Sequence, residues 1–148
     1  MAYVCPLCSI DPFAHSLKKI EETDEMIYYY TCPSQAKLYY DLDGIISHYN
    51  GVLSEMPRNK QWIWIFDSTG FDFKHIMYPS IAIELAKLIS NKFSSNLQKI
   101  IIINPTFYIN LSYKIVTPFL KSSVLSVIKM DYYTKTWQEI IKKIKNKK

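Results

Sequence analysis

Three apolar runs of strand length, separated by segments with helical spacing, constrain the fold most strongly. They are QWIWIF at 61–66, QKIIII at 98–103 and VLSVIKM at 124–130. Strands that are apolar throughout, rather than alternating, are typical of a parallel sheet covered on both faces. Parallel neighbours need long crossover connections, and these are usually helices. We therefore predict an α/β fold, a layered sheet of about four to five mainly parallel strands with helices packed on it.

The remaining segments fill in this pattern. The run MIYYYT at 26–31 is rich in residues that favour strands and predicts a further strand. Helical spacing of apolar residues predicts helices over 76–93, 106–120 and 134–145, with one or two short helices over 33–53. The chain is the size of one domain. We divide it into an N-terminal Cys/His entry segment, residues 1–25, and a single α/β domain, residues 26–148.

The net charge of +5 is concentrated at one end of the chain, because five lysines lie in the last seven residues, KKIKNKK. Without them, 13 basic residues balance 13 acidic ones, which argues against a dedicated nucleic-acid-binding module. The lysine tail is either a solvated helix end or a weak contact to an anionic membrane. With only three glycines, a glycine-rich phosphate loop is excluded.

Localisation follows from what the chain does not contain. The first twenty residues show no apolar signal-peptide run, and no run approaches the roughly 20 residues of a membrane span. An odd number of cysteines fits a reducing compartment. We expect a cytoplasmic protein that touches membranes only at their periphery.

Asp67 follows the run at 61–66 and begins the corner DSTG. A phosphotransferase with an aspartate nucleophile needs a second acid two residues on, where Thr69 stands. An aspartic protease motif is spoiled by the extra residue of DSTG. We interpret Asp67 as a structural carboxylate that accepts hydrogen bonds within a turn, with Gly70 supplying a positive φ. No nucleophile and base have a reason to converge, so we expect no enzymatic activity.

The order of the strand-end motifs resembles the CRAL-TRIO (Sec14-like) lipid-binding family. The resemblance rests on WIFD at 64–67 followed by Gly70-Phe71, on IIINP at 101–105 and on TPFL at 117–120. Residues 28–53 also resemble the divergent branch of that family that includes the BCH domains. The match covers roughly residues 27–131.

The resemblance implies a lipid cavity between the sheet and a mobile lid helix over 106–120. Phe66 and Ile103 would belong to its floor. His75 would be either a polar ligand contact or the cap of the next helix, and the apolar stripe of 106–120 is also what an ordinary core helix presents. The implied ligand-binding residues are Phe66, Phe71, His75, Ile103, Phe107, Tyr108, Leu111, Val116, Phe119 and Leu120.

The implied function is non-enzymatic binding, and transfer, of a lipid or other hydrophobic small molecule, with transient docking on a membrane. Lys114 and Lys121 would contact anionic headgroups. The alternative is a BCH-like scaffold that binds a small GTPase or itself, with a reduced or absent cavity. A lipid carrier should co-purify with its ligand, whereas a scaffold should not.

The cysteines and the first histidine form the pattern C-x2-C-x6-H-x16-C, from Cys5, Cys8, His15 and Cys32. Three thiolates and one imidazole satisfy tetrahedral zinc, so this pattern predicts a structural zinc ion, and no other cofactor is required. A redox-active CxxC is the alternative. His48 lies in a helical stretch, and we interpret it as a packed surface histidine.

Overall fold

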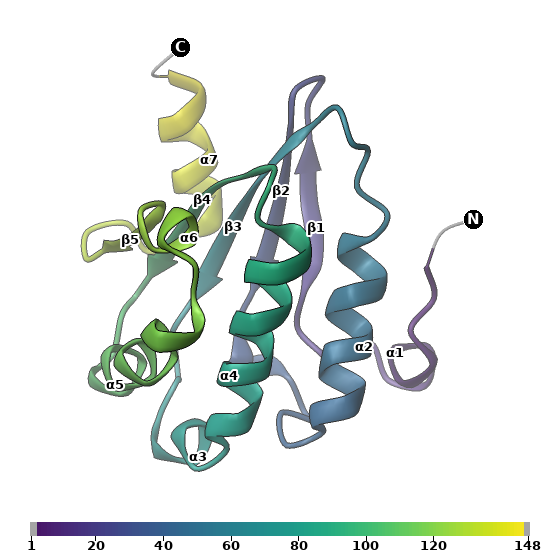
Figure 1. Cartoon of the computed structure of the whole chain (residues 1–148), viewed down its shortest axis with the longest axis vertical. Helices are drawn as coiled ribbons and strands as arrows, with labels where there is room; N and C mark the ends of the chain where they lie inside the picture. The colour runs from purple at the N-terminus through teal and green to yellow at the C-terminus, as the bar shows by residue number, and fades with distance from the viewer. Residues whose placement is uncertain (1–2, 147–148) are drawn as a thin grey trace.

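A computed structural model describes residues 3–146, so Lys147 and Lys148 of the predicted lysine tail lie outside the described residues. Its centre is one five-stranded sheet whose strand order follows the chain, β1-β2-β3-β4-β5 (Figure 1). β1 is antiparallel to β2, and every other neighbouring pair is parallel. The predicted α/β fold with a mainly parallel sheet is confirmed. The strands are β1 (Lys18–Glu22), β2 (Met26–Thr31), β3 (Gln61–Asp67), β4 (Leu97–Ile103) and β5 (Ile128–Asp131).

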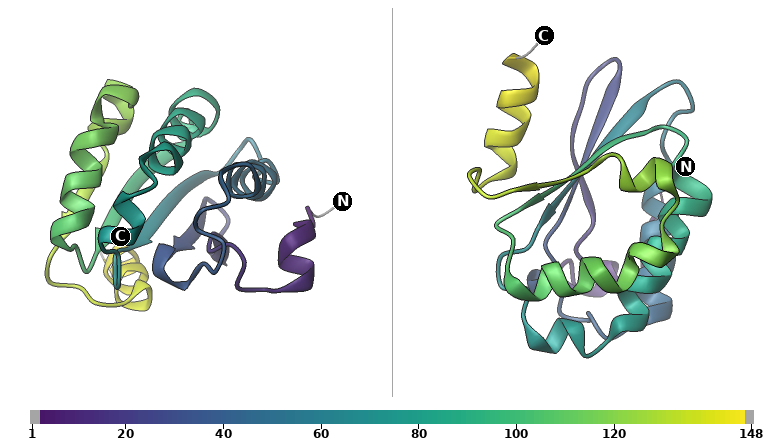
Figure 2. Two further views of the ribbon diagram at one scale, coloured as in Figure 1. Left: turned by 90° about the horizontal axis from the view of Figure 1, so that it is seen from below. Right: turned by 60° about the vertical axis from the view of Figure 1, so that its left-hand side comes forward.

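The crossover helices α2, α4 and α5 all cover one face of the sheet, and the last helix, α7, covers the other (Figure 2). This arrangement follows from the strand order, because each right-handed crossover to the next strand returns on the same side. The helices are α1 (Pro6–Ile10), α2 (Leu42–Leu53), α3 (Phe73–Ile76), α4 (Pro79–Leu88), α5 (Phe107–Val116), α6 (Ser122–Leu125) and α7 (Trp137–Asn146). Short 3-10 turns cover Pro33–Gln35 and Thr117–Phe119, and a π turn, Ile89–Phe93, continues α4.

Alternation along the strands divides the core into two layers. Trp62 and Trp64 of β3 pack toward α2 and α4, whereas Ile63 and Ile65 belong to the layer under α7. Side chains of a strand point alternately to the two faces, so parity decides which layer a residue joins. The buried stretches of β3 and β4, residues 62–65 and 100–103, are therefore apolar because both of their faces are covered.

The predicted helix over 76–93 is interrupted, because α3 ends at Ile76 and α4 begins only at Pro79. Two further segments differ from the prediction. β1, with the sequence KKIEE, was not predicted as a strand. Its charged residues suit an edge strand, which pairs with a neighbour on one side and faces solvent on the other. The predicted strand over 124–130 is wrong in its first half, where the chain makes the helical turn α6 and β5 starts only at Ile128. The turn is closed by hydrogen bonds from the Ser126 amide to the Ser122 carbonyl and from the Val127 amide to the Val124 carbonyl.

Candidate functional site

A cavity of about 120 Å³ lies between the sheet and the helices α2, α4 and α5. Its floor comes from β3 and β4, its sides from α2 and α4, and its roof from α5 and the turn after it. The lining is almost entirely apolar. The main wall residues are Tyr39, Ile45, Tyr49, Trp64, Phe66, Phe71, Ile81, Leu85, Ile100, Ile102, Ile109, Val116 and Leu120.

The size of the cavity limits what it holds as it stands. An engineered apolar cavity of about 150 Å³ stays dry and binds benzene, whereas pockets for larger ligands measure about 300–1,000 Å³. At about 120 Å³ the cavity accommodates a ring or a short alkyl segment. A longer chain requires that one of the covering helices move outward.

Three of the polar side chains at the cavity wall are hydrogen bonded to one another. The Trp64 indole N–H donates to Thr31 Oγ1 at 3.1 Å, and the Thr31 and Tyr49 hydroxyls lie 3.1 Å apart. Burial raises the pKa of Tyr49, so its phenol is neutral. Because these three groups satisfy each other, they offer little to a water molecule, which needs two to four polar partners.

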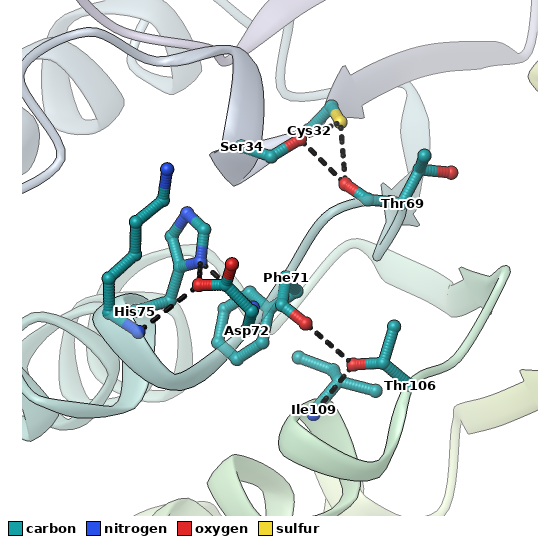
Figure 3. A network of polar contacts seen from close by, with 9 residues as sticks. Cys32, Ser34, Thr69, Phe71, Asp72, His75, Thr106 and Ile109 are labelled. Carbon is teal, nitrogen blue, oxygen red and sulfur yellow. Dashed lines mark hydrogen bonds and ion pairs between the residues drawn. The ribbon is translucent and has the colours of Figure 1, made fainter.

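The N-terminal end of α5 is anchored to the turn that follows β3. The Thr106 hydroxyl donates to the Phe71 carbonyl at 2.9 Å and accepts from the Ile109 amide at 3.2 Å, so one side chain both caps α5 and ties it to the turn (Figure 3). The Phe71 ring stacks on the His75 ring with centroids 4.9 Å apart. This end of the roof is therefore a fixed point.

Asp67 forms the polar corner at the end of β3. Its carboxylate accepts hydrogen bonds from the Thr69 amide at 3.0 Å, the Thr69 hydroxyl at 2.7 Å, the Tyr30 hydroxyl at 2.7 Å and the Asn104 amide group at 3.1 Å. Gly70 has φ +75°, as the turn requires. Burial alone would raise the pKa of Asp67, but these hydrogen bonds outweigh it and lower the pKa below its ordinary value. The interpretation of Asp67 as a structural corner is confirmed.

The predicted cavity residues divide into two groups. The structure places Phe66, Phe71, Val116 and Leu120 on the cavity wall. Ile103 lies on the opposite face, in the layer that contacts α7, so its assignment to the floor beside Phe66 is corrected. The register pairs Phe66 with Ile102, which therefore takes that position.

His75 lies beside the cavity rather than on its wall. Its Nδ1 accepts the Asp72 backbone amide at 3.0 Å, and the Asp72 carboxylate accepts the Lys74 amide, which makes a capping box at the start of α3 (Figure 3). Burial lowers the pKa of His75 and outweighs the nearby Asp72 carboxylate. The capping alternative for His75 is therefore confirmed.

The remaining predicted residues of the lid helix do not line the cavity. Those of its residues that line the cavity are Ile109, Ser112, Tyr113 and Val116, which recur at helical spacing and form one face of α5. Phe107, Tyr108, Leu111 and Phe119 lie outside this face, and Phe107 is 69% exposed. Lys114 and Lys121 are both exposed.

Several wall residues were missed although the sequence carried a signal for them. Alternation in β3 and β4 places Trp64 and Ile102 on the same face as Phe66. Ile45 and Tyr49 stand four residues apart in α2, the spacing of one helix face. Tyr39, in the irregular segment before α2, gave no such signal.

A second group of side chains meets at the N-terminal segment. Cys5, Cys8, His15 and His48, called here the Cys/His cluster, bring their ligand atoms within 4.8 Å of one another. His15 Nδ1 lies 3.4 Å from Cys5 Sγ and 3.7 Å from Cys8 Sγ, and His48 Nδ1 lies 3.7 Å from Cys8 Sγ. This donor set could hold a metal ion.

The cluster corrects the predicted fourth ligand. Cys32 follows β2, and its Sγ faces the Ser34 hydroxyl at 3.4 Å and the Thr69 carbonyl at 3.7 Å (Figure 3). His48 takes its place because α2 runs back along the sheet and carries that side chain to the entry segment. His48 is buried rather than on the surface as predicted.

Comparison with known proteins now identifies the fold. The sequence profile of the CRAL/TRIO domain matches residues 11–148. The chain belongs to the CRAL-TRIO family. The fold is also similar to the crystal structure of Sfh5, with a TM-score of 0.58 at 10% sequence identity. That alignment covers 79% of this chain and 46% of Sfh5, so the chain spans about half the length of that relative.

A comparison with curated proteins found no match. CRAL-TRIO domains bind lipids or other hydrophobic small molecules, and the chain has the scaffold on which they do so. The likeness to the BCH branch stays a prediction. Among residues 3–146, no helix is both long enough and apolar enough to cross a membrane.

Proposed function

We propose that this CRAL-TRIO domain binds a lipid or other hydrophobic small molecule in the cavity beneath α5, without catalysing a reaction on it. The observation that carries the proposal is the almost entirely apolar cavity on the face of the sheet that α5 covers. Three of the polar groups on its wall, Thr31, Tyr49 and Trp64, are hydrogen bonded to one another and so do not need water as a partner.

A chain longer than the cavity enters by displacing α5. Each buried CH₂ contributes about 0.8 kcal/mol, so a few methylene groups offset the loss of packing when a short helix moves. The Thr106–Phe71 hydrogen bond fixes one end of α5, and Pro118 interrupts the backbone hydrogen bonding just beyond the other. We expect α5 to swing about the Thr106 end.

Transfer of the ligand requires contact with a membrane, and we assign that contact to the apolar tip formed by Phe73, Met77 and Tyr78 at α3 and Phe107 at α5. Their side chains are 60%, 61%, 45% and 69% exposed. Exposed apolar residues that gather in one place mark sites of interaction. Lys74 lies in the tip, and Lys114 and Lys121 are exposed along and after α5, where they would meet anionic headgroups of a cytoplasmic leaflet.

Filling the cavity tests the proposal. Ala82 of α4 lies on the cavity wall, whereas Ile83, the next residue, does not. Ala82→Phe should occupy much of the cavity and weaken binding of a fluorescent long-chain fatty acid at least tenfold, about 1.4 kcal/mol. Ile83→Phe adds the same side chain outside the cavity and should bind like the wild-type chain.

Native mass spectrometry supplies the second readout. The wild-type chain and Ile83→Phe should carry a non-covalent ligand that disappears on denaturation, and Ala82→Phe should carry much less. The proposal is overturned if the wild-type chain is free of ligand and also fails to bind the fatty acid. In that case, the interaction scaffold would become the better interpretation.

A further inference from the structure

We infer that the Cys/His cluster is a closed structural site for one zinc ion, bound by Cys5, Cys8, His15 and His48. Zinc lies about 2.3 Å from sulfur and about 2.0–2.1 Å from nitrogen, so tetrahedral geometry separates a sulfur from a nitrogen ligand by about 3.6 Å. The three contacts between sulfur and Nδ1 measure 3.4, 3.7 and 3.7 Å. The four side chains are therefore already spaced as zinc ligands.

The far nitrogens of both histidines face oxygen acceptors. His48 Nε2 lies 2.8 Å from the Leu17 carbonyl, and His15 Nε2 lies 3.6 Å from the Asp41 carboxylate. The Leu17 carbonyl keeps the proton of His48 on Nε2 and leaves its Nδ1 lone pair directed at Cys8 Sγ. The Asp41 carboxylate lies beyond hydrogen-bond distance of His15 Nε2 and favours the same tautomer of His15 through its charge. Histidine ligands of zinc are usually oriented by such a carboxylate or carbonyl. Without a metal, each of the two thiols could donate only one hydrogen bond. One of the three contacts between sulfur and Nδ1 would then have no proton.

Charge and burial favour a structural role. Two thiolates and two neutral imidazoles cancel the charge of Zn²⁺, so the site can be buried at little electrostatic cost. Cys5, His15 and His48 are all less than 9% exposed, and Cys8 is half-buried. Four protein ligands leave no open position for a substrate or a water molecule, as is typical of structural rather than catalytic zinc.

The site explains how the N-terminal segment stays in place. α1 has five residues and buries none of them, and helices this short are not stable alone. Val4, shortly before the helix, and Ile10, its last residue, are 70% and 84% exposed, so little apolar packing holds α1. Bound zinc would join Cys5 and Cys8 to His48 in the middle of α2. The Tyr3 ring, which lies where a side chain at Gly51 would stand, adds a second contact to the same helix.

This inference does not depend on lipid binding, although the two sites share one residue. His15 belongs both to the cluster and to the cavity wall. Zinc would therefore hold one side of the cavity in position. The metal content is measured without any lipid, so failure of one proposal can be told from failure of the other.

The test is metal analysis of the whole chain together with its native mass. We expect one zinc ion per chain and a mass gain of about 63 Da, which is zinc less the two thiol protons that coordination releases. Cobalt substituted for zinc should give the visible absorption of tetrahedral thiolate coordination. A chain that binds no zinc when titrated after reduction, or that is isolated about 2 Da lighter through a Cys5–Cys8 disulfide, would overturn the inference.

Variants distinguish this ligand set from the pattern that uses Cys32. Cys8→Ser and His48→Ala should each weaken zinc binding at least a hundredfold, and Cys32→Ser should keep one zinc ion per chain. Asp41→Asn should still cap α2, where Asp41 accepts the Gly44 amide at 3.2 Å, but should lower zinc affinity about tenfold through the lost carboxylate. Loss of zinc from Cys32→Ser with retention in His48→Ala would contradict the assignment. Should a variant fail to fold, the titration of the wild-type chain still decides.

Discussion

At the scale of single residues, Asp67 shows how one buried carboxylate organises the end of a strand. It accepts hydrogen bonds from Tyr30 on β2, from Thr69 in its own turn and from Asn104 after β4. Hydrogen bonds to a charged acceptor contribute about 1.5–3 kcal/mol each, more than those between neutral groups. Asp67 therefore joins the carboxyl ends of β2, β3 and β4. The segments that lead into α3 and α5 start at this end of the sheet.

We predict that Asp67→Asn lowers the free energy of unfolding by about 1–3 kcal/mol at pH 7. The lowered pKa of Asp67 means that the ionised form stabilises the fold above the unfolded-state pKa of about 3.9 and that this stabilisation is lost as the pH falls through the folded-state pKa. The difference between the variant and the wild-type chain should therefore shrink below about pH 4. Urea unfolding at several pH values measures it.

A matched control for that measurement is Asp24→Asn, in the exposed turn between β1 and β2. It should change the free energy of unfolding by less than about 0.5 kcal/mol at every pH. A pH-independent loss in Asp67→Asn would show that shape, and not the carboxylate charge, is what the corner requires.

The Cys/His cluster shows how far metal ligands can be predicted from the spacing of residues in the sequence. The CxxC pair and His15 were predicted from a local pattern, and the structure brings them together. His48 could not be found that way, because its approach depends on how α2 returns along the sheet. Cys32 was predicted as the fourth ligand because it would complete a set of three cysteines and one histidine. In the structure its sulfur instead contacts the Ser34 hydroxyl and the Thr69 carbonyl.

At the scale of elements, long periodic segments were predicted well and edges were not. β3 and β4 carry strong patterns because both of their faces are covered, and the helix at 106–120 does so because one of its faces packs toward the sheet. β1 is charged and becomes a strand only through pairing with β2, so nothing in its own composition indicated it. The prediction that Ile103 lies on the cavity floor was wrong by one residue. Neighbouring residues of a strand point to opposite faces of the sheet, so Ile102 takes that place.

The apolar tip on α3 and α5 leads to a prediction about membrane binding. Phe107→Ser should reduce binding to vesicles that contain anionic lipid about tenfold, because a buried Phe contributes about 1.5–3 kcal/mol. Tyr133→Ser, which removes an aromatic ring that is 90% exposed after β5, should leave vesicle binding unchanged. Vesicle sedimentation measures both. Equal losses in the two variants would mean that general surface hydrophobicity, and not the apolar tip, contacts the membrane.

At the scale of the whole molecule, the two faces of the sheet are built differently. One face is covered by α7 over a layer rich in buried isoleucines and tyrosines. The other is covered by α2, α4 and α5, and it retains the cavity. Helices that converge from several crossovers leave space between them more readily than one helix laid on a sheet. We attribute ligand binding to that face, and zinc would brace it at the N-terminal side.

The most direct test is a methyl NMR titration of isoleucine-labelled protein with a long-chain fatty acid. Ile102 of β4 and Ile109 of α5 line the cavity, whereas Ile101 and Ile103 lie in the layer under α7 and provide internal controls. We predict large shifts at Ile102 and Ile109 that saturate at one ligand per chain, with Ile101 and Ile103 almost unchanged. Shifts concentrated at Ile101 and Ile103, or no shift at saturating ligand, would contradict a lipid site beneath α5.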